Sequence, residues 1–143
     1  MQINGVPGSV TDVNHKNWIS VRSFESGISR AVQHRVGFGE PRDSSIPKFS
    51  VLKLSKKADA SSGELYQRAC SGKVFPSVRF HVCNETDSQS PYVEYVLSDV
   101  LISRFVDSVS SAGMPSEQIS LSYLKMERSY INKTASGALT APK

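Results

Sequence analysis

Alternation typical of a β-strand is most extended over residues 91–109. Apolar and aromatic residues fill both alternating rows of residues 92–97, and β-branched residues are frequent there. Ser98 and Asp99 interrupt the alternation, which then resumes over residues 100–106. After its first residue the stretch contains no Gly or Pro, so we predict one long strand with a bend or bulge at Ser98 and Asp99. Because it is apolar in both rows, we expect it in a barrel wall or in a sheet buried by a partner chain.

Weaker strand patterns lie on both sides of this stretch. Strands are predicted over residues 18–24 with an extension toward residue 32, and over 48–54, 73–83 and 118–131. In the last of these the apolar positions shift from odd to even numbers after Tyr123, which is the signature of a β-bulge. The intervening polar segments, residues 56–62, 84–90 and 110–116, are predicted as turns.

Residues 62–71 carry the clearest helical signals in the chain. Ser61 or Ser62 can cap the N-terminus, and Gly72 can end the helix. A helix this short is unstable alone and must dock on a sheet. The sequence therefore predicts a mainly β fold in a single domain over residues 1–143: a closed or nearly closed β-barrel of two antiparallel sheets with one short flanking helix.

Composition adds limits on function. The net charge is +4, but the basic residues are dispersed apart from Lys48, Lys53, Lys56 and Lys57. Nucleic-acid readers usually combine a denser basic face with aromatics, so we expect no nucleic-acid partner. No apolar run reaches membrane-spanning length and the start lacks a signal-peptide pattern, so we expect neither membrane insertion nor a signal peptide. Serine is abundant, and serine suits the solvated face of a strand.

Reactive side chains do not form a recognisable motif. The three histidines are far apart, and Cys70 and Cys83 form no CxxC pair, so we expect no metal site. We likewise expect no catalytic residue and no cofactor. Both cysteines are expected to be reduced, with Cys70 shielded where the helix docks on the sheet. Glu94 is interpreted either as a surface residue or as one partner of an intersubunit ion pair.

Four stretches of the chain have an order and spacing that are informative when taken together: residues 3–29, 49–73, 92–105 and 117–130. The most specific piece is the spacing of Gly5, Asp12, His15, Trp18 and Ile19; Ser71-Gly72-Lys73 after the helix and Tyr95 with Asp99-Val100 add to it. Together they resemble the Hcp (hemolysin-coregulated protein) family, the tube protein of the bacterial type VI secretion system. The chain departs from the family at Ser26 and Arg128, where tryptophan is common, and in family strands at both ends that are absent or nearly so.

The resemblance implies a structural protein similar to phage tail-tube proteins. Six subunits would close into a ring, and rings would stack into a tube expelled by a contractile sheath. The expected partners are further copies of the chain, the sheath and spike proteins, and effectors carried in the lumen. The protein would be made in the bacterial cytoplasm and secreted without a signal peptide. A neutral, serine-rich strand face suits the wall of such a water-filled conduit.

Residues 33–47 form a predicted loop with large apolar side chains at Val36, Phe38 and Ile46. A loop of this kind is a liability on a monomer unless something covers it. It either folds back into the core or reaches toward neighbouring subunits, and the resemblance favours the second. These three residues, with Glu94 and Asp99, are the candidate assembly-interface residues.

Two alternative functions remain open on the sequence. The composition also fits a small monomeric β-barrel that acts as a binding module. An enzyme with an unrecognised site is the third hypothesis, although little reactive geometry supports it. The size of the particle in solution separates the tube protein from the binding module.

Overall fold

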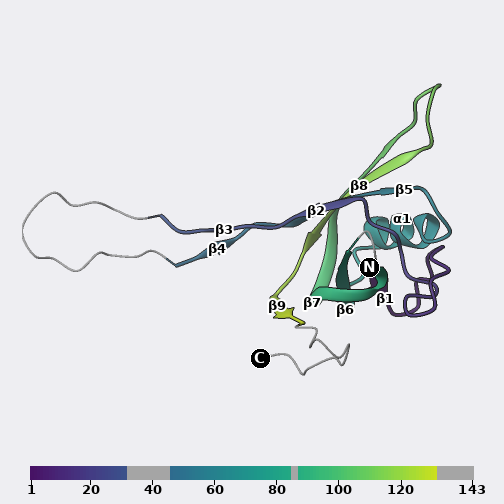
Figure 1. The fold of residues 1–143 in the computed structure, drawn as a ribbon. Helices are drawn as coiled ribbons and strands as arrows, with labels where there is room; N and C mark the ends of the chain where they lie inside the picture. Colours follow the sequence, from purple (N-terminus) through teal and green to yellow (C-terminus); the bar gives the residue numbers. More distant parts are fainter. Residues whose placement is uncertain (32–45, 85–86, 132–143) are drawn as a thin grey trace, which may run out of the picture.

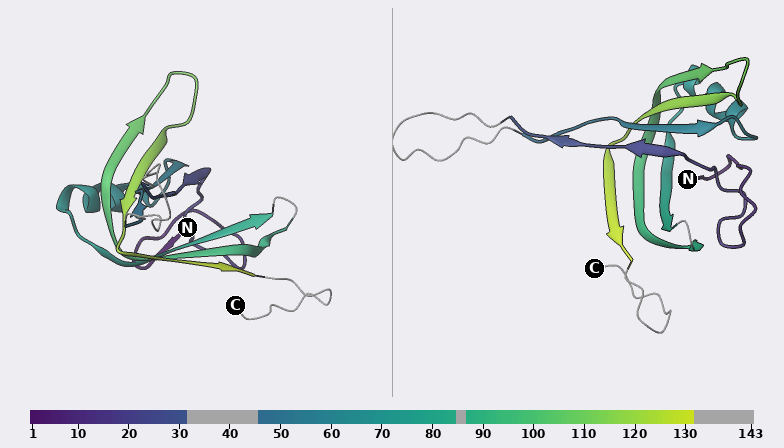
Figure 2. Two further views of the ribbon diagram at one scale, coloured as in Figure 1. Left: turned by 90° about the vertical axis from the view of Figure 1, so that its left-hand side faces the viewer. Right: turned by 45° about the horizontal axis from the view of Figure 1, so that its top comes forward.

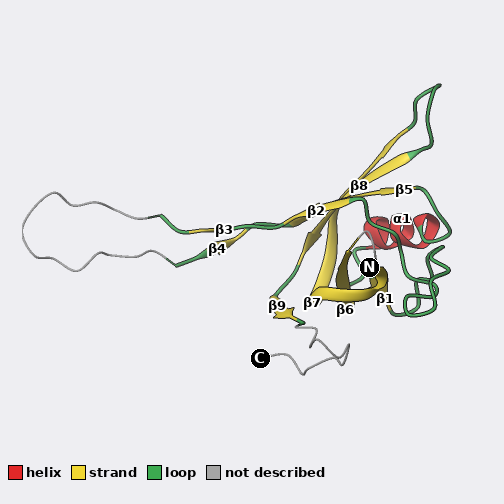
Figure 3. Ribbon diagram, in the orientation of Figure 1, coloured by secondary structure: helices red, strands yellow, loops and turns green. Residues whose placement is uncertain are grey.

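The computed structural model describes residues 1–31, 46–84 and 87–131. Its elements in chain order are β1 (Gln2–Ile3), β2 (Ser23–Glu25), β3 (Ile28–Ser29), β4 (Lys48–Phe49), β5 (Leu52–Lys57), α1 (Ser62–Ser71), β6 (Phe75–Asn84), β7 (Asp87–Ser108), β8 (Ser116–Ser122) and β9 (Lys125–Tyr130) (Figures 1 and 3). The mainly β fold with one short helix is confirmed.

Strand β7 joins two antiparallel sheets. Its first half pairs with β6 on one side and β9 on the other, and β6 in turn pairs with β1. Its second half pairs with β8, which is followed by β5 and β2. Figure 2 shows the two sheets diverging from β7 and the hairpin of β7 and β8 extending from the body. The path ends at β1 and β2 without closing, so the barrel is nearly closed rather than closed.

The bend predicted in the central strand is present at Asp99. This residue has a φ of 52°, a left-handed conformation that Asp tolerates better than most residues. The buried positions change from Val93 and Leu97 before the bend to Val100 and Ile102 after it. The bend therefore moves the apolar row to the other parity, and it coincides with the exchange of β9 for β8 as the neighbouring strand.

The same change of phase occurs in the chain opposite. Strands β8 and β9 are separated at Tyr123 and Leu124, and the Leu124 N–H donates to the Ser98 carbonyl at 3.1 Å. Met126 then packs against the core, as the predicted shift requires, whereas Leu124 is 84% exposed. The two kinks lie side by side, so both strands bend together.

Helix α1 closes the core on one side. Leu65 is 1% exposed, and burying a leucine contributes about 1.5–3 kcal/mol. Gly72 ends the helix in a left-handed conformation, and its N–H donates to the Arg68 carbonyl at 3.0 Å. Ser61 occupies the N-cap but makes no side-chain cap, because its hydroxyl donates to Asp59 instead. The predicted serine cap is therefore wrong, whereas the glycine stop is confirmed.

Cysteine placement differs in part from expectation. Cys70 and Cys83, both within the described residues, form no disulfide. Cys70 is exposed, so the prediction that helix docking shields it is wrong. The reason is helical geometry: at about 100° per residue, a position five residues after Leu65 points well away from the buried side.

Two strand predictions also need correction. Residues 18–22 are not a strand, because the backbone there bonds to the N-terminal segment outside any regular ladder: the Ile19 N–H donates to the Met1 carbonyl at 2.7 Å, and the Val10 N–H donates to the Trp18 carbonyl at 3.0 Å. Strand β5 continues to Lys57 through the segment predicted as a turn, and Lys56 is fully buried there. Leu52 and Leu54 set the phase that carries Lys56 inward.

The N-terminal segment packs against β6 through a ring cluster. His15 Nε2 lies 2.9 Å from His81 Nδ1, and the Trp18 ring centroid is 4.5 Å from that of His81. Burial lowers the pKa of His81 below its ordinary value, against the opposing effect of Glu94. Burial likewise lowers the pKa of the Met1 amine, which donates to the Ile19 carbonyl, to about 5.

Candidate functional site

The sheet β2–β5–β8–β7 presents one continuous polar face. Cα register aligns Arg104, Ser120, Lys53 and Glu25 in one row across the four strands. The neighbouring same-face row contains Val106, Gln118, Ser55 and Ser23. We call this surface the polar face; it comprises Ser23, Glu25, Lys53, Ser55, Lys57, Leu101, Arg104, Val106, Ser108, Ser116, Gln118, Ser120 and Ser122.

The reverse side of the same four strands belongs to the core. Leu52, Leu54, Ile119 and Leu121 are at most 3% exposed and alternate with the residues of the polar face. An antiparallel sheet with one packed and one solvated side shows this alternation. The polar face is therefore a water-facing surface with the core behind it. It is rich in serine, as the sequence predicts, but it is not neutral, because Lys53, Lys57, Arg104 and Glu25 also lie on it.

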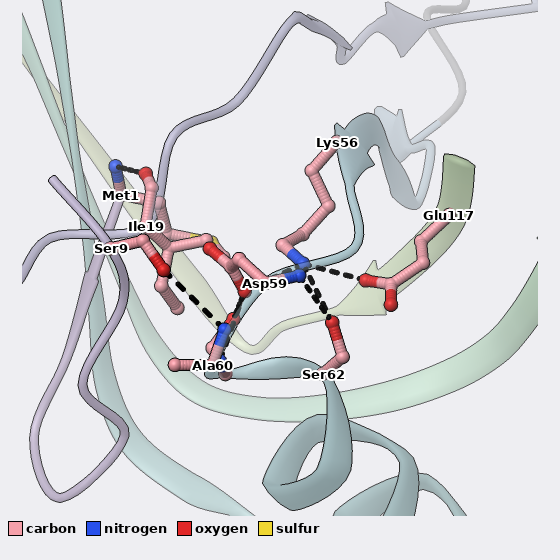
Figure 4. Close-up of polar contacts among 9 residues, drawn as sticks. Met1, Ser9, Ile19, Lys56, Asp59, Ala60, Ser62 and Glu117 are labelled. Carbon is pink, nitrogen blue, oxygen red and sulfur yellow. Dashed lines mark hydrogen bonds and ion pairs between the residues drawn. The ribbon is translucent and has the colours of Figure 1, made fainter. Parts of the chain in front are cut away.

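A buried ion cluster fixes the end of this sheet to α1. Lys56 Nζ lies 2.6 Å from Glu117 Oε2 on β8 and 3.0 Å from Asp59 Oδ1. It also donates to the Ser62 hydroxyl at 3.2 Å, at the start of the helix (Figure 4). Lys56 and Glu117 are 0% and 3% exposed, so the charges neutralise each other away from water. The cluster joins β5, β8 and the helix behind the polar face.

The polar face has an excess of positive charge. Lys53, Lys57 and Arg104 are all exposed, and none forms an ion pair with another residue in the described ranges. Glu25, cross-strand neighbour of Lys53, is the one carboxylate of the face. A shallow groove of about 480 Å³ crosses these strands between Glu25 and Arg104. Lys53 and Lys57 are recognisable in the sequence as basic residues, but only the strand register shows that they share a face with Arg104.

A second exposed surface lies on the two-stranded ribbon of β3 and β4. Figure 1 shows this ribbon projecting away from the body, as a continuation of β2 and β5. Large apolar side chains are exposed along it: Ile28 by 68%, Phe49 by 60% and Ile46 by 84%. We call this surface the apolar ribbon. Of the predicted assembly residues, Ile46 is therefore exposed, whereas Val36 and Phe38 lie outside the described residues.

The other two candidate assembly residues lie on β7. Glu94 Oε1 is 3.1 Å from Arg79 Nε and 3.2 Å from His81 Nε2, so the carboxylate has partners within its own chain. Asp99 is exposed at the bend, where its left-handed backbone gives it a structural role. Glu94 and Asp99 do not adjoin the apolar ribbon, and their part in assembly stays a prediction.

A larger open pocket of about 880 Å³ lies between the N-terminal segment and β6. Trp18, Phe24 and Phe80 supply its aromatic lining, and His15 and His81 are in contact within it. In the described part of the chain no group of His, Cys, Asp and Glu side chains could hold a metal ion. No helix in the described ranges is long and apolar enough to cross a membrane.

Comparison with known families gives one clear match. The family model described as "Type VI secretion system effector, Hcp" matches residues 1–130. No curated protein sequence matches the chain.

Solved structures share the fold at low sequence identity. A structure described as a type six secretion system protein has a TM-score of 0.88 at 24% identity, covering 99% of this chain and 88% of that one. Hcp1 from Salmonella typhimurium has a TM-score of 0.77 at 23% identity, covering 97% of this chain and 87% of that one. A type VI secretion effector from Yersinia pestis has a TM-score of 0.75 at 22% identity, covering 97% of this chain and 92% of that one.

Proposed function

Because the chain belongs to the Hcp family of the type VI secretion system, we propose that it is a tube protein whose copies close into a ring of six. Rings would stack into the inner tube, and their lumen would carry effectors. The match over residues 1–130 is the observation that carries the proposal. The sheath, the spike and the effectors are the proposed partners, and the protein would leave the bacterial cytoplasm through the machine that it helps to build.

The architecture supports closure of a ring. Among the described residues, strand β2 pairs with β5 alone, and residues 101–108 of β7 pair with β8 alone, so within these residues the four-stranded sheet has two edges open to pairing. Open edges are templates for another strand. A head-to-tail contact between different patches on successive copies can close a ring. In such a ring the polar face would form the wall of the lumen, since its solvated surface needs no partner.

Native mass spectrometry tests the ring directly. We expect a species of six subunits at micromolar protein, and we expect negative-stain images to show rings. The heterologous contact must recur identically around the ring, so lower oligomers should be minor. A chain that stays monomeric or dimeric under these conditions would contradict the proposal and would fit the binding module instead.

We place the contact between rings, or between neighbouring subunits, on the apolar ribbon and residues 33–47. Large apolar side chains on the ribbon are exposed and so do not stabilise a single subunit: Ile28, Ile46 and Phe49. Contact with another copy would remove them from water. Glu94 and Asp99 are proposed as secondary interface residues. Because both lie on β7 and not on β3 or β4, they would serve a contact other than the one proposed for the ribbon.

Phe38→Ser tests this arm. We expect ring closure or stacking to weaken, because each subunit loses on the order of 1.5–3 kcal/mol of apolar burial. Far-ultraviolet circular dichroism and the melting temperature of dilute protein should change little. Val13→Ser is the matched control, since Val13 is 83% exposed on the N-terminal segment. If Phe38→Ser unfolds the subunit while surviving rings stack normally, residue 38 belongs to the core and the arm hypothesis is wrong.

A further inference from the structure

Three cationic side chains lie near one another on the polar face. Arg104 and Lys53 share a row two strands apart, which corresponds to roughly 10 Å between their backbones. Lys57 lies four residues along β5 from Lys53, or about 13 Å. These separations exceed the screening length of about 8 Å at physiological salt, so each cation acts on the part of a bound segment next to it. An extended segment covers about 3.3 Å per residue, so three or four residues reach from one cation to the next. The single carboxylate, Glu25, offsets only part of this field.

The residues between the cations are small, neutral hydrogen-bonding groups. Serines and Gln118 occupy most of these positions, Val106 and Leu101 are the apolar residues of the registered rows, and these rows place no aromatic side chain on the polar face. Nucleic-acid grooves combine cations with aromatic rings on which bases stack, and this face has no such rings. It also lacks the apolar centre of a tight protein interface. The chemistry fits a polypeptide held by charge and hydrogen bonds, and released easily.

We propose that the polar face binds acidic segments of passenger proteins. The inference rests on the proposed function, in which six copies of this face surround the lumen and repeat the cation group around it. A surface of one sign lining a narrow channel concentrates molecules of the opposite sign. The passengers selected by this chain would therefore carry carboxylate-rich surfaces, and binding would weaken as salt rises.

The test uses assembled protein and a short fluorescein-labelled poly-L-glutamate, with binding followed by fluorescence anisotropy. The Lys53→Glu, Arg104→Glu double variant reverses two charges on the polar face. The matched control is Lys16→Glu, Lys73→Glu, which makes the same charge change at exposed positions outside this face. Native mass spectrometry first establishes that each protein forms rings. Poly-L-lysine and a single-stranded oligonucleotide serve as competing probes.

We expect poly-L-glutamate to bind wild-type rings and the control variant alike, with affinity that falls as salt rises. The polar-face variant should lose about ten-fold or more in affinity, as expected for interfaces that depend on complementary charge. Equal loss in both variants would show that net charge alone acts, and would overturn the inference. Stronger binding of the oligonucleotide would overturn it in favour of nucleic acid. Rings that bind no acidic probe would refute the inference alone, whereas wild-type protein without rings would refute the proposed function as well.

Discussion

Replacing Lys56 with methionine should destabilise the folded subunit by about 3–5 kcal/mol, because it leaves a buried carboxylate without its counter-ion. Glu117 is 3% exposed, and Lys56 Nζ at 2.6 Å is its ion-pair partner in the described structure. The loss of Lys56 should destabilise the Asp59 carboxylate less, because it keeps a hydrogen bond from the Ser61 N–H at 2.9 Å. Urea unfolding followed by circular dichroism measures the loss as a lower midpoint at unchanged slope.

The controls separate the ion pair from the loss of a long side chain. Lys57→Met, one residue along β5 and exposed on the polar face, should change stability by no more than about 0.5 kcal/mol. The double variant Lys56→Met, Glu117→Leu removes both charges and should recover much of the loss, because apolar replacements of a buried pair are often neutral. A single Lys56→Met variant as stable as the parent would show that Glu117 reaches water or another partner.

Local patterns in the sequence were sufficient to predict the mainly β fold, the helix and the bend in the central strand. Alternation over residues 91–109 predicts β7, and Gly72 ends α1 as expected. These features depend on a few neighbouring residues and on backbone preferences that side chains carry with them. The serine cap failed because Asp59, two residues before Ser61, attracts its hydroxyl, and propensity alone does not settle such local competition.

The candidate site depended on information that the sequence does not hold locally. Lys53, Arg104 and Glu25 come from three strands, and only the register brings them into one row. Lys56 could have been found from the sequence, since it keeps the phase of Leu52 and Leu54. The charge of Lys56 favours a solvent-exposed turn in a prediction from sequence. The carboxylate that makes its burial possible belongs to Glu117, which lies 61 residues away on β8. Long-range pairing therefore decided the position that local polarity misjudged.

Gly8→Ala should open the N-terminal segment, because a Cβ at this position has no room. It would lie 2.3 Å from the Trp18 carbonyl oxygen and 2.6 Å from the Ile19 Cα, both backbone atoms that cannot rotate away. The segment is held there by the Gly8 N–H, which donates to the Asn17 carbonyl at 2.8 Å, and by a bond from Val10 to Trp18 at 3.0 Å. The two backbone segments joined by these bonds must separate to admit the methyl group.

We expect Gly8→Ala to cost about 1–3 kcal/mol or more, the usual range for overpacking, since relief requires backbone movement. Trp18 is the one tryptophan of the chain, so its fluorescence reports on this segment alone and should shift to the red as the indole reaches water. Gly63→Ala is the matched control: its Cβ meets nothing within 4 Å, and alanine in α1 should stabilise by up to about 1 kcal/mol. A Gly8→Ala variant with unchanged emission and unfolding midpoint would show that the segment is not packed as described.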